Sequence, residues 1–232
     1  MAVWITLKEV YCLRQDNMTD FFTGLIRSLY GITESIGLPN YGLAIIMLTL
    51  VVKLAMFPLT RMQSKSMKAM QEIQPMVKEL QKKYANDKEK MNMEVAKLYQ
   101  EQKVNPMASC LPLLIQFPII IALFNAMRDF FVPELNASFL WVNNLGEPDL
   151  WVLPILAGIS TFLQQKVAMT GEVTGQQKSM LYIMPVFMGW ISRSFPAGLA
   201  LYWFFFNVWS TLEQLVIRGK FKFGGGEGTA KP

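Results

Sequence analysis

The sequence has no histidine and only two cysteines, Cys12 and Cys110. Histidine is the commonest general base in enzymes, so its absence removes the most frequent acid–base chemistry. The cysteines do not have the spacing of zinc ligands, and the chain has no GxSxG, HExxH or glycine-rich phosphate-binding motif. We therefore expect neither an enzymatic activity nor a metal or other cofactor.

Charge is scarce as well: 17% of the residues are charged and 52% are hydrophobic. Long apolar runs recur, which is typical of a polytopic helical membrane protein. The first run, YGLAIIMLTLVVKLAMFPL at 41–59, carries a single charge, Lys53. A lone ammonium inside a bilayer is costly unless it finds water or a partner. Lys53 either extends toward the interface on the side of Arg61 or belongs to a functional polar site.

Five membrane spans are predicted from the apolar runs, at residues 41–61, 106–131, 150–169, 179–193 and 197–217. Asn105 and Pro106 have the residue types of a helix start. The fourth span has about 15 residues, or roughly 22 Å of helix, which is shorter than the ~30 Å hydrocarbon core. A short span implies local thinning of the bilayer or irregular packing.

The segment before the first span, residues 1–40, is predicted to lie outside the cell. Within it, residues 17–37 have the pattern of an amphipathic helix that either lies in the membrane interface or packs on other helices. Residues 1–17 lack the apolar core of a signal peptide. The predicted apolar face consists of Phe21, Leu25, Leu29 and Ile32.

The segment between the first two spans, residues 62–105, is strongly polar. Two narrow apolar seams, one from Met70 to Tyr84 and one from Met91 to Leu98, flank a turn at 85–87. This pattern predicts an antiparallel helical hairpin in water. The segment is also rich in methionine, which either fills the seam or forms a deformable surface for varied apolar segments.

The distribution of basic residues predicts the orientation. Lysine and arginine are concentrated in the hairpin and in the tail at 218–232, whereas the connection at 132–149 has none. The positive-inside rule then places the hairpin, the loop at 170–178 and the tail in the cytoplasm and the N-terminus outside, with Arg193 as an exception. Cys12 and Cys110 would lie on opposite sides, so no disulfide is expected.

Four segments carry a resemblance to a known family. They are the first span followed by FPLTRMQSKSM, then KVNPMASCLPLLIQFPIIIALF, then LPILAGISTFLQQK, and then IMPVFMGWISRSFPAGLALYWFFFN. Together they cover nearly the whole chain from residue 41, in order and at the family's spacing. The chain resembles the YidC/Oxa1/Alb3 family of membrane protein insertases. It lacks the large periplasmic domain of Gram-negative members and so resembles the short Gram-positive type.

The resemblance implies an all-α integral membrane protein of a bacterial cell membrane. Its five spans would enclose a hydrophilic groove that is open to the cytoplasm and to lipid and closed on the outer side. The implied function is insertion and folding of nascent membrane proteins. The implied partners are those nascent chains, the ribosome, the Sec translocon and anionic lipids. The basic hairpin and tail could contact either ribosomal RNA phosphates or lipid headgroups, without a specific nucleic-acid sequence.

The resemblance also implies a set of groove residues. Lys53 falls where the family usually has arginine, and lysine keeps the charge but loses the planar fork of donors. The glutamines could instead serve only in interhelical hydrogen bonds, and the two aromatic residues only in packing. The remaining implied groove residues are Thr49, Gln116, Gln164, Gln165, Tyr202 and Trp203.

Two other functions compete with an insertase. In a small-anion transporter or channel, Lys53 would bind the anion, but the halves of the sequence show no inverted repeat. In a purely structural assembly factor, the bundle would scaffold other complexes. In the insertase, a hydrophilic tail would enter a wet pocket at Lys53, and its apolar segment would then partition into lipid.

Overall fold

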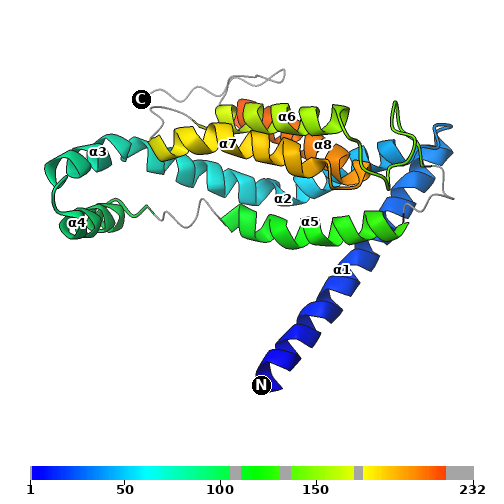
Figure 1. Ribbon diagram of the computed structural model, residues 1–232, viewed down its shortest axis with the longest axis horizontal. Coiled ribbons are helices and arrows are strands. Elements are labelled where there is room, and N and C mark those ends of the chain that lie inside the picture. The colour runs from blue at the N-terminus through cyan, green and yellow to red at the C-terminus, as the bar shows by residue number, and fades with distance from the viewer. Residues whose placement is uncertain (1, 105–110, 131–136, 170–174, 218–232) are drawn as a thin grey trace, which may run out of the picture.

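The computed structural model describes residues 2–104, 111–130, 137–169 and 175–217. Within these ranges the regular secondary structure is helical, apart from an isolated bridge between Phe139 and Val142. Figure 1 shows α2, α5, α6, α7 and α8 running alongside one another, with α3 and α4 at one end and α1 projecting from the bundle. The all-α class predicted from the sequence is confirmed. The helices are α1 (Ala2–Ser35), α2 (Tyr41–Glu72), α3 (Gln74–Lys83), α4 (Lys88–Glu101), α5 (Leu111–Phe130), α6 (Val152–Ala168), α7 (Gly175–Ser192) and α8 (Ala197–Ile217).

The helix that carries Lys53 is longer than the predicted span. The side chain of Asn40 caps α2 by accepting hydrogen bonds from the backbone N–H groups of Gly42 and Leu43. The helix then continues through Pro58 to Glu72, because residues 62–72 are mostly good helix formers. Among the described helices, only α2 is both long enough and apolar enough to cross a membrane. The mean hydropathy of its most apolar 18-residue window is 2.2.

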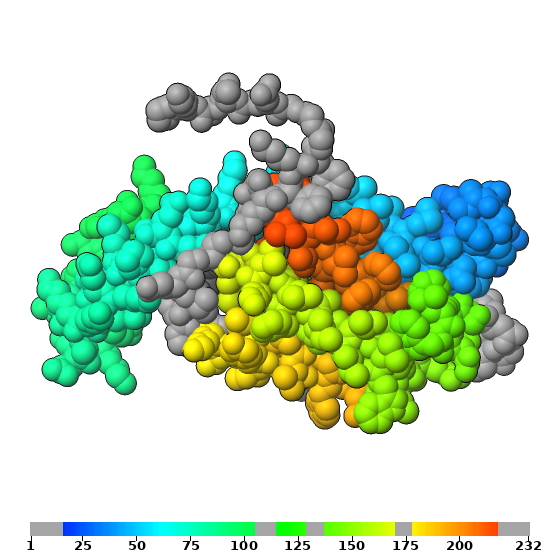
Figure 2. Space-filling model, turned by 90° about the horizontal axis from the view of Figure 1, so that it is seen from above, coloured from blue at the N-terminus to red at the C-terminus, as the bar shows by residue number. Residues whose placement is uncertain are grey.

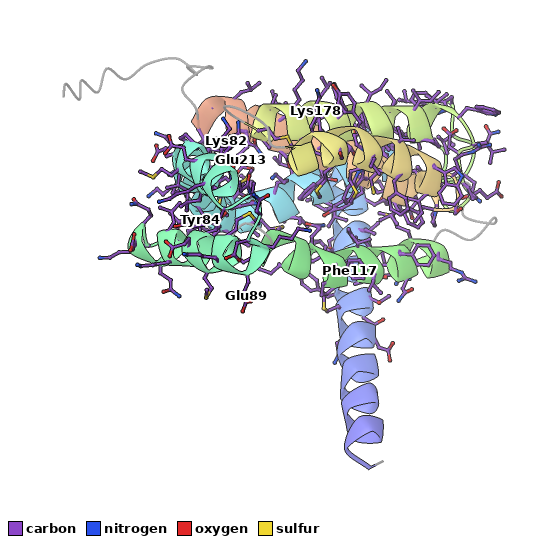
Figure 3. The ribbon with its side chains drawn as sticks, turned by 60° about the vertical axis from the view of Figure 1, so that its left-hand side comes forward. Lys82, Tyr84, Glu89, Phe117, Lys178 and Glu213 are labelled. Carbon is purple, nitrogen blue, oxygen red and sulfur yellow. The ribbon has the colours of Figure 1, made fainter. Side chains whose placement is uncertain are left out.

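The polar hairpin has its arms in α3 and α4. The chain breaks at Ile73, with a proline in the first turn of α3, and the side chain of Asp87 caps α4. Tyr84, which is labelled in Figure 3, lies between the two helices in sequence. The ammonium groups of Lys83 and Lys90 lie 5.3 and 5.4 Å from its ring centroid. The hairpin therefore has a defined turn with its own contacts.

The hairpin methionines divide between the two predicted roles. Met70 and Met91 are half-buried, as expected for seam residues. Met62 near the end of the apolar run, Met76 on α3 and Met93 on α4 are 68%, 47% and 60% exposed. The exposed set leaves a polarisable apolar surface on the segment next to the bundle.

The buried face of α1 is shifted by one residue from the predicted face. Phe21 and Ile32 are 64% and 48% exposed, so these two residues of the predicted apolar face lie outside the surface that packs on other helices. The helix also begins at Ala2 rather than near residue 17. Adjacent apolar residues at 21 and 22 allow two neighbouring helical faces, and packing against α2 and α5 selects the second. The buried face consists of Phe22, Ile26, Leu29 and Thr33.

The connection before α6 closes one end of the bundle. Its Leu145 is fully buried, and its backbone carbonyl accepts a 2.8 Å hydrogen bond from the N–H of Gly198 at the start of α8. The carbonyl of Glu147 accepts a second 2.8 Å bond from Ala197. A Cβ on Gly198 would lie 3.1 Å from Ile45 Cδ1 on α2. The connection and the first turn of α8 are therefore packed as one unit.

Asp149 ends this connection and caps α6. Its carboxylate accepts hydrogen bonds from the backbone N–H groups of Trp151, Val152 and Leu153 and from the Trp141 indole. Burial raises the pKa of Asp149, but these hydrogen bonds outweigh it and the pKa is lowered overall. The charged cap is therefore retained at neutral pH.

Helices α6 and α7 approach each other closely through two glycines. An ideal Cβ on Gly158 would lie 3.1 Å from the carbonyl oxygen of Pro185, and one on Gly189 would lie 3.1 Å from that of Pro154. Figure 2 shows the two helices side by side on one face of the molecule. Small residues at a helix crossing are typical of membrane proteins, where association depends on close packing.

We predict that Gly158→Leu destabilises the protein, because a side chain at this crossing would force α6 away from the backbone of α7. The expected cost is about 1–3 kcal/mol, measured as a lower unfolding temperature in detergent. Gly24→Leu is the matched control, since no heavy atom lies within 4 Å of its Cβ position. Equal melting temperatures for the two variants would contradict the close crossing.

Candidate functional site

Helix α8 is the element on which the candidate site is built. Its polar side chains point to three different neighbours: Tyr202 to α5, Asn207 to α6 and Glu213 to α2. Apolar and aromatic residues fill the positions between them. One helix therefore joins the polar groups of the bundle.

The most buried charge of the structure is paired. Lys53 Nζ on α2 lies 2.7 Å from Glu213 Oε2 on α8, and the two side chains are 7% and 9% exposed. The ammonium also lies 4.7 Å from the ring centroid of Phe206, within cation–π distance. Lys53 is thus held inside the bundle and does not extend to the surface. The pair carries no net charge.

Sequence reasoning missed Glu213, although a signal was present. Glu213 is the only acidic residue between 197 and 217, and an acid within an apolar run is itself a candidate partner for a buried cation. The structure identifies Glu213 as the partner of Lys53.

Thr49 lies on the same face of α2 as Lys53, one turn earlier, and is fully buried. Its hydroxyl donates a 2.7 Å hydrogen bond to the carbonyl of Ile45 in its own helix. Thr49 therefore adjoins the ion pair, and its hydrogen bond stays within α2.

Gln116 and Tyr202 join α5 to α8. The Gln116 amide donates a 3.2 Å hydrogen bond to the hydroxyl of Tyr202, and both side chains are buried. The Tyr202 ring lies 5.8 Å from that of Phe206, which in turn contacts Lys53. These contacts bring three of the predicted residues, Lys53, Gln116 and Tyr202, into one connected cluster.

Trp203 contributes to a second group of bonds, between α8 and α6. Its indole N–H donates a 3.0 Å hydrogen bond to Thr161 Oγ1, which also accepts a 3.0 Å bond from the Asn207 amide. The same amide lies 3.2 Å from Ser160 Oγ. Sequence reasoning missed Asn207, Ser160 and Thr161, although each is polar within an apolar run.

Gln164 and Gln165 are half-buried on α6. Gln165 Oε1 is a buried acceptor without a hydrogen-bond partner, and the structure gives neither glutamine a contact with Lys53. Of the buried side-chain atoms without a hydrogen bond in the described ranges, only the Trp209 indole nitrogen is a donor. The acceptors are Gln74 Oε1, Gln116 Oε1, Gln165 Oε1, Gln214 Oε1 and both carboxylate oxygens of Glu213, of which Oε2 contacts Lys53.

The two ends of the bundle differ in polarity. The end closed by Leu145 has an apolar core, whereas the end nearer the hairpin holds the ion pair and the unpartnered acceptors. Figure 3 labels Glu213 in the last turns of α8, on the hairpin side. The fully buried apolar side chains include Ile45, Leu48, Leu123, Met127, Leu145 and Leu153.

An apolar cavity of about 540 Å³ lies elsewhere, between α6 and α7. Trp151, Ile155, Val186 and Trp190 are among its lining residues, and none of the predicted site residues lines it. Its walls are strongly exposed apolar side chains, as expected for a surface that faces lipid.

The comparisons with known proteins agree with this description. A family model described as 60Kd inner membrane protein matches residues 31–224. A membrane protein insertase YidC of Fusobacterium nucleatum is 43% identical over 182 residues, which are 78% of this chain and 87% of the relative. A membrane protein insertase YidC of Oceanobacillus iheyensis is 45% identical over 201 residues, 80% of this chain and 78% of the relative.

A solved structure is also similar. It is described as an active YidC insertase crystal structure with the first transmembrane domain resolved, and it has a TM-score of 0.67 at 26% identity. The match covers 89% of this chain and 46% of that chain, so this chain spans about half the length of the solved one.

The structure is an α-helical bundle with a buried ion pair, and one of its helices, α2, is long and apolar enough to cross a membrane. Together with the family match over residues 31–224, these features show that the chain belongs to the 60Kd inner membrane protein family.

We predict that Thr161→Val weakens the contact between α6 and α8, because this substitution leaves the Trp203 indole and the Asn207 amide without their shared acceptor. The expected cost is about 1–2 kcal/mol, measured by thermal unfolding in detergent. Thr211→Val is the matched control, since the hydroxyl of Thr211 bonds only to a carbonyl of its own helix. A control that unfolds as early as Thr161→Val would contradict this interpretation.

Proposed function

We propose that this protein is a membrane protein insertase of a bacterial cell membrane that receives hydrophilic segments of nascent membrane proteins at the polar cluster around Lys53. Relatives named membrane protein insertase YidC, matched over 78–90% of their lengths at 40–45% identity, support the function. The single observation that carries the placement of the site is the buried pair of Lys53 and Glu213 inside an apolar bundle.

The proposed topology has five spans, provided by the apolar part of α2 and by α5, α6, α7 and α8. The excess of lysine and arginine on the hairpin favours its placement in the cytoplasm. The polar cluster would then lie in the inner half of the membrane. The closed end at Leu145 would face outward, as would the N-terminus.

The proposed mechanism starts with entry of a hydrophilic segment at the hairpin end. The segment would exchange contacts with Lys53, Glu213 and the unpartnered acceptors, so its polar groups would not have to enter bare hydrocarbon. Its apolar part would then partition into lipid along the bundle. The chain contains no nucleotide-binding motif, so the driving force would come from partition, from the membrane potential or from the ribosome.

A small-anion transporter fits the site less well. Lys53 is already neutralised by Glu213, and an anion site needs uncompensated positive charge or donors. Among the described residues, the side chains around Leu123 and Leu145 form an apolar core, which is unfavourable for an anion moving toward the closed end. Both observations favour a site that is entered from one side.

The hairpin is proposed to make the first contact with substrate. Its exposed methionines supply an adaptable apolar surface, and its many lysines can bind anionic lipid headgroups or ribosomal RNA. The ribosome and the Sec translocon are proposed as partners because the sequence resembles the insertase family.

We predict that a photocrosslinker at Trp203 reacts with a ribosome-stalled membrane protein, because a segment that extends from the ion pair to Tyr202 comes next to this half-buried neighbour on α8. A photocrosslinker at Trp190, 68% exposed on α7, serves as the matched control and should react mainly with lipid. The measurement is the yield of crosslinked nascent chain in proteoliposomes. Strong flux of small anions without crosslinks at position 203 would favour the transporter instead.

We predict that replacing Met76 and Met93 together by glutamine lowers the crosslinking of early, short nascent chains about threefold. Both side chains are exposed, so the unfolding temperature should stay unchanged. The half-buried pair Met70 and Met91, replaced in the same way, should instead lower the unfolding temperature. Unchanged early crosslinking in the Met76 and Met93 variant would exclude these side chains from substrate capture.

A further inference from the structure

The cation at the centre of the proposed site has an internal partner. We propose that Glu213 is a specificity-determining residue, which competes with acidic residues of an inserting segment for Lys53 and offers its own carboxylate to basic ones. This inference rests on the proposed insertase function and deepens it. It follows from the pairing in this structure and from the carboxylate oxygen of Glu213 that has no partner.

The geometry makes Glu213 an effective competitor. Its Oε2 lies 2.7 Å from the Lys53 ammonium, and the side chain is more than nine-tenths buried. Charges in such surroundings interact strongly, because little water screens them. A carboxylate of a substrate must therefore displace a carboxylate that is already held in place by two helices.

The charge balance distinguishes this site from one with an unpaired cation. A lone lysine would gain a neutral pair when an acidic residue arrives. At the pair of Lys53 and Glu213, an acidic residue instead brings two carboxylates to one ammonium and leaves a net negative charge in a low-dielectric site. Acidic residues therefore lose the advantage that an unpaired Lys53 would give them.

The hydrogen-bonding capacity of the cluster favours donors. Glu213 Oε1 has no hydrogen-bond partner, and neither has the buried Oε1 of Gln116 in the connected cluster. A lysine side chain, or the N–H groups of an entering backbone, can satisfy such acceptors, whereas a carboxylate cannot. The site thus accepts neutral and basic segments at least as well as acidic ones.

The test uses a single-span substrate whose short translocated tail carries one variable residue, either Asp, Asn or Lys. Insertion into proteoliposomes is measured by protease protection. In the wild type, we expect the Asp tail to have no advantage over the Asn tail, and the Lys tail to insert as well as the Asn tail. With Glu213→Gln, the ratio of Asp-tail to Asn-tail insertion should rise about five- to tenfold, and the Lys tail should fall behind.

Two variants show whether the effect runs through the ion pair. In the double variant Lys53→Gln with Glu213→Gln, the preference for the Asp tail should disappear, since no unpaired cation remains. Glu72→Gln is the matched control, because it removes an exposed carboxylate of α2, and it should leave all ratios unchanged. If Glu213→Gln does not fold, Glu213→Asp keeps the charge, and its ratios should stay close to those of the wild type.

Two results would overturn the inference. One is a wild-type protein that prefers the Asp tail over the Asn tail, and the other is a Glu213→Gln variant with unchanged ratios. A purely structural role for Glu213 would lower insertion of all three tails equally, which also leaves the ratios unchanged. Failure of the wild type to insert even the Asn tail would instead contradict the proposed function itself.

Discussion

The fold depends on satisfying one buried charge. In an apolar bundle, the ammonium of Lys53 must meet a carboxylate, and the carboxylate must come from a neighbouring helix at the right height. Glu213 meets this requirement from α8, which fixes the position of α8 along α2. Once α8 is placed, Tyr202 reaches Gln116 on α5, and Asn207 reaches Thr161 on α6. The contacts of one helix thus determine where three others lie.

The two sides of α8 are held by different forces. Toward α6, three hydrogen bonds from Trp203 and Asn207 converge on two hydroxyls, and α6 in turn packs closely on α7 through Gly158. Toward α2 and α5, the polar contacts are the ion pair and the single bond from Gln116. Since buried ion pairs contribute little net stability, the side that contains the candidate site is the side with fewer directional bonds.

Much of this architecture is visible in the sequence, and the remainder has identifiable physical causes. Apolar runs predict the helices, and α8 has the predicted bounds because Pro196 and the basic tail mark its ends. The end of α2 was placed too early, since polar helix formers continue a helix as readily as apolar ones. The sequence could not show which face of α1 packs on the bundle, because Phe21 and Phe22 are both apolar. Glu213 is marked in the sequence as the only acidic residue of its apolar run, but its pairing with Lys53 depends on the tertiary placement of α8 beside α2.

The backbone hydrogen bonds from the first turn of α8 to Leu145 and Glu147 have a consequence for the ion permeability of the membrane. Because these hydrogen bonds hold the helices together at one end of the bundle, the helices can separate only at the other end. Each transient opening of the bundle would then form a cavity that is closed at one end and not a pore through the membrane. A bacterium could carry out many such openings without discharging the ion gradient that powers its ATP synthesis and its transporters.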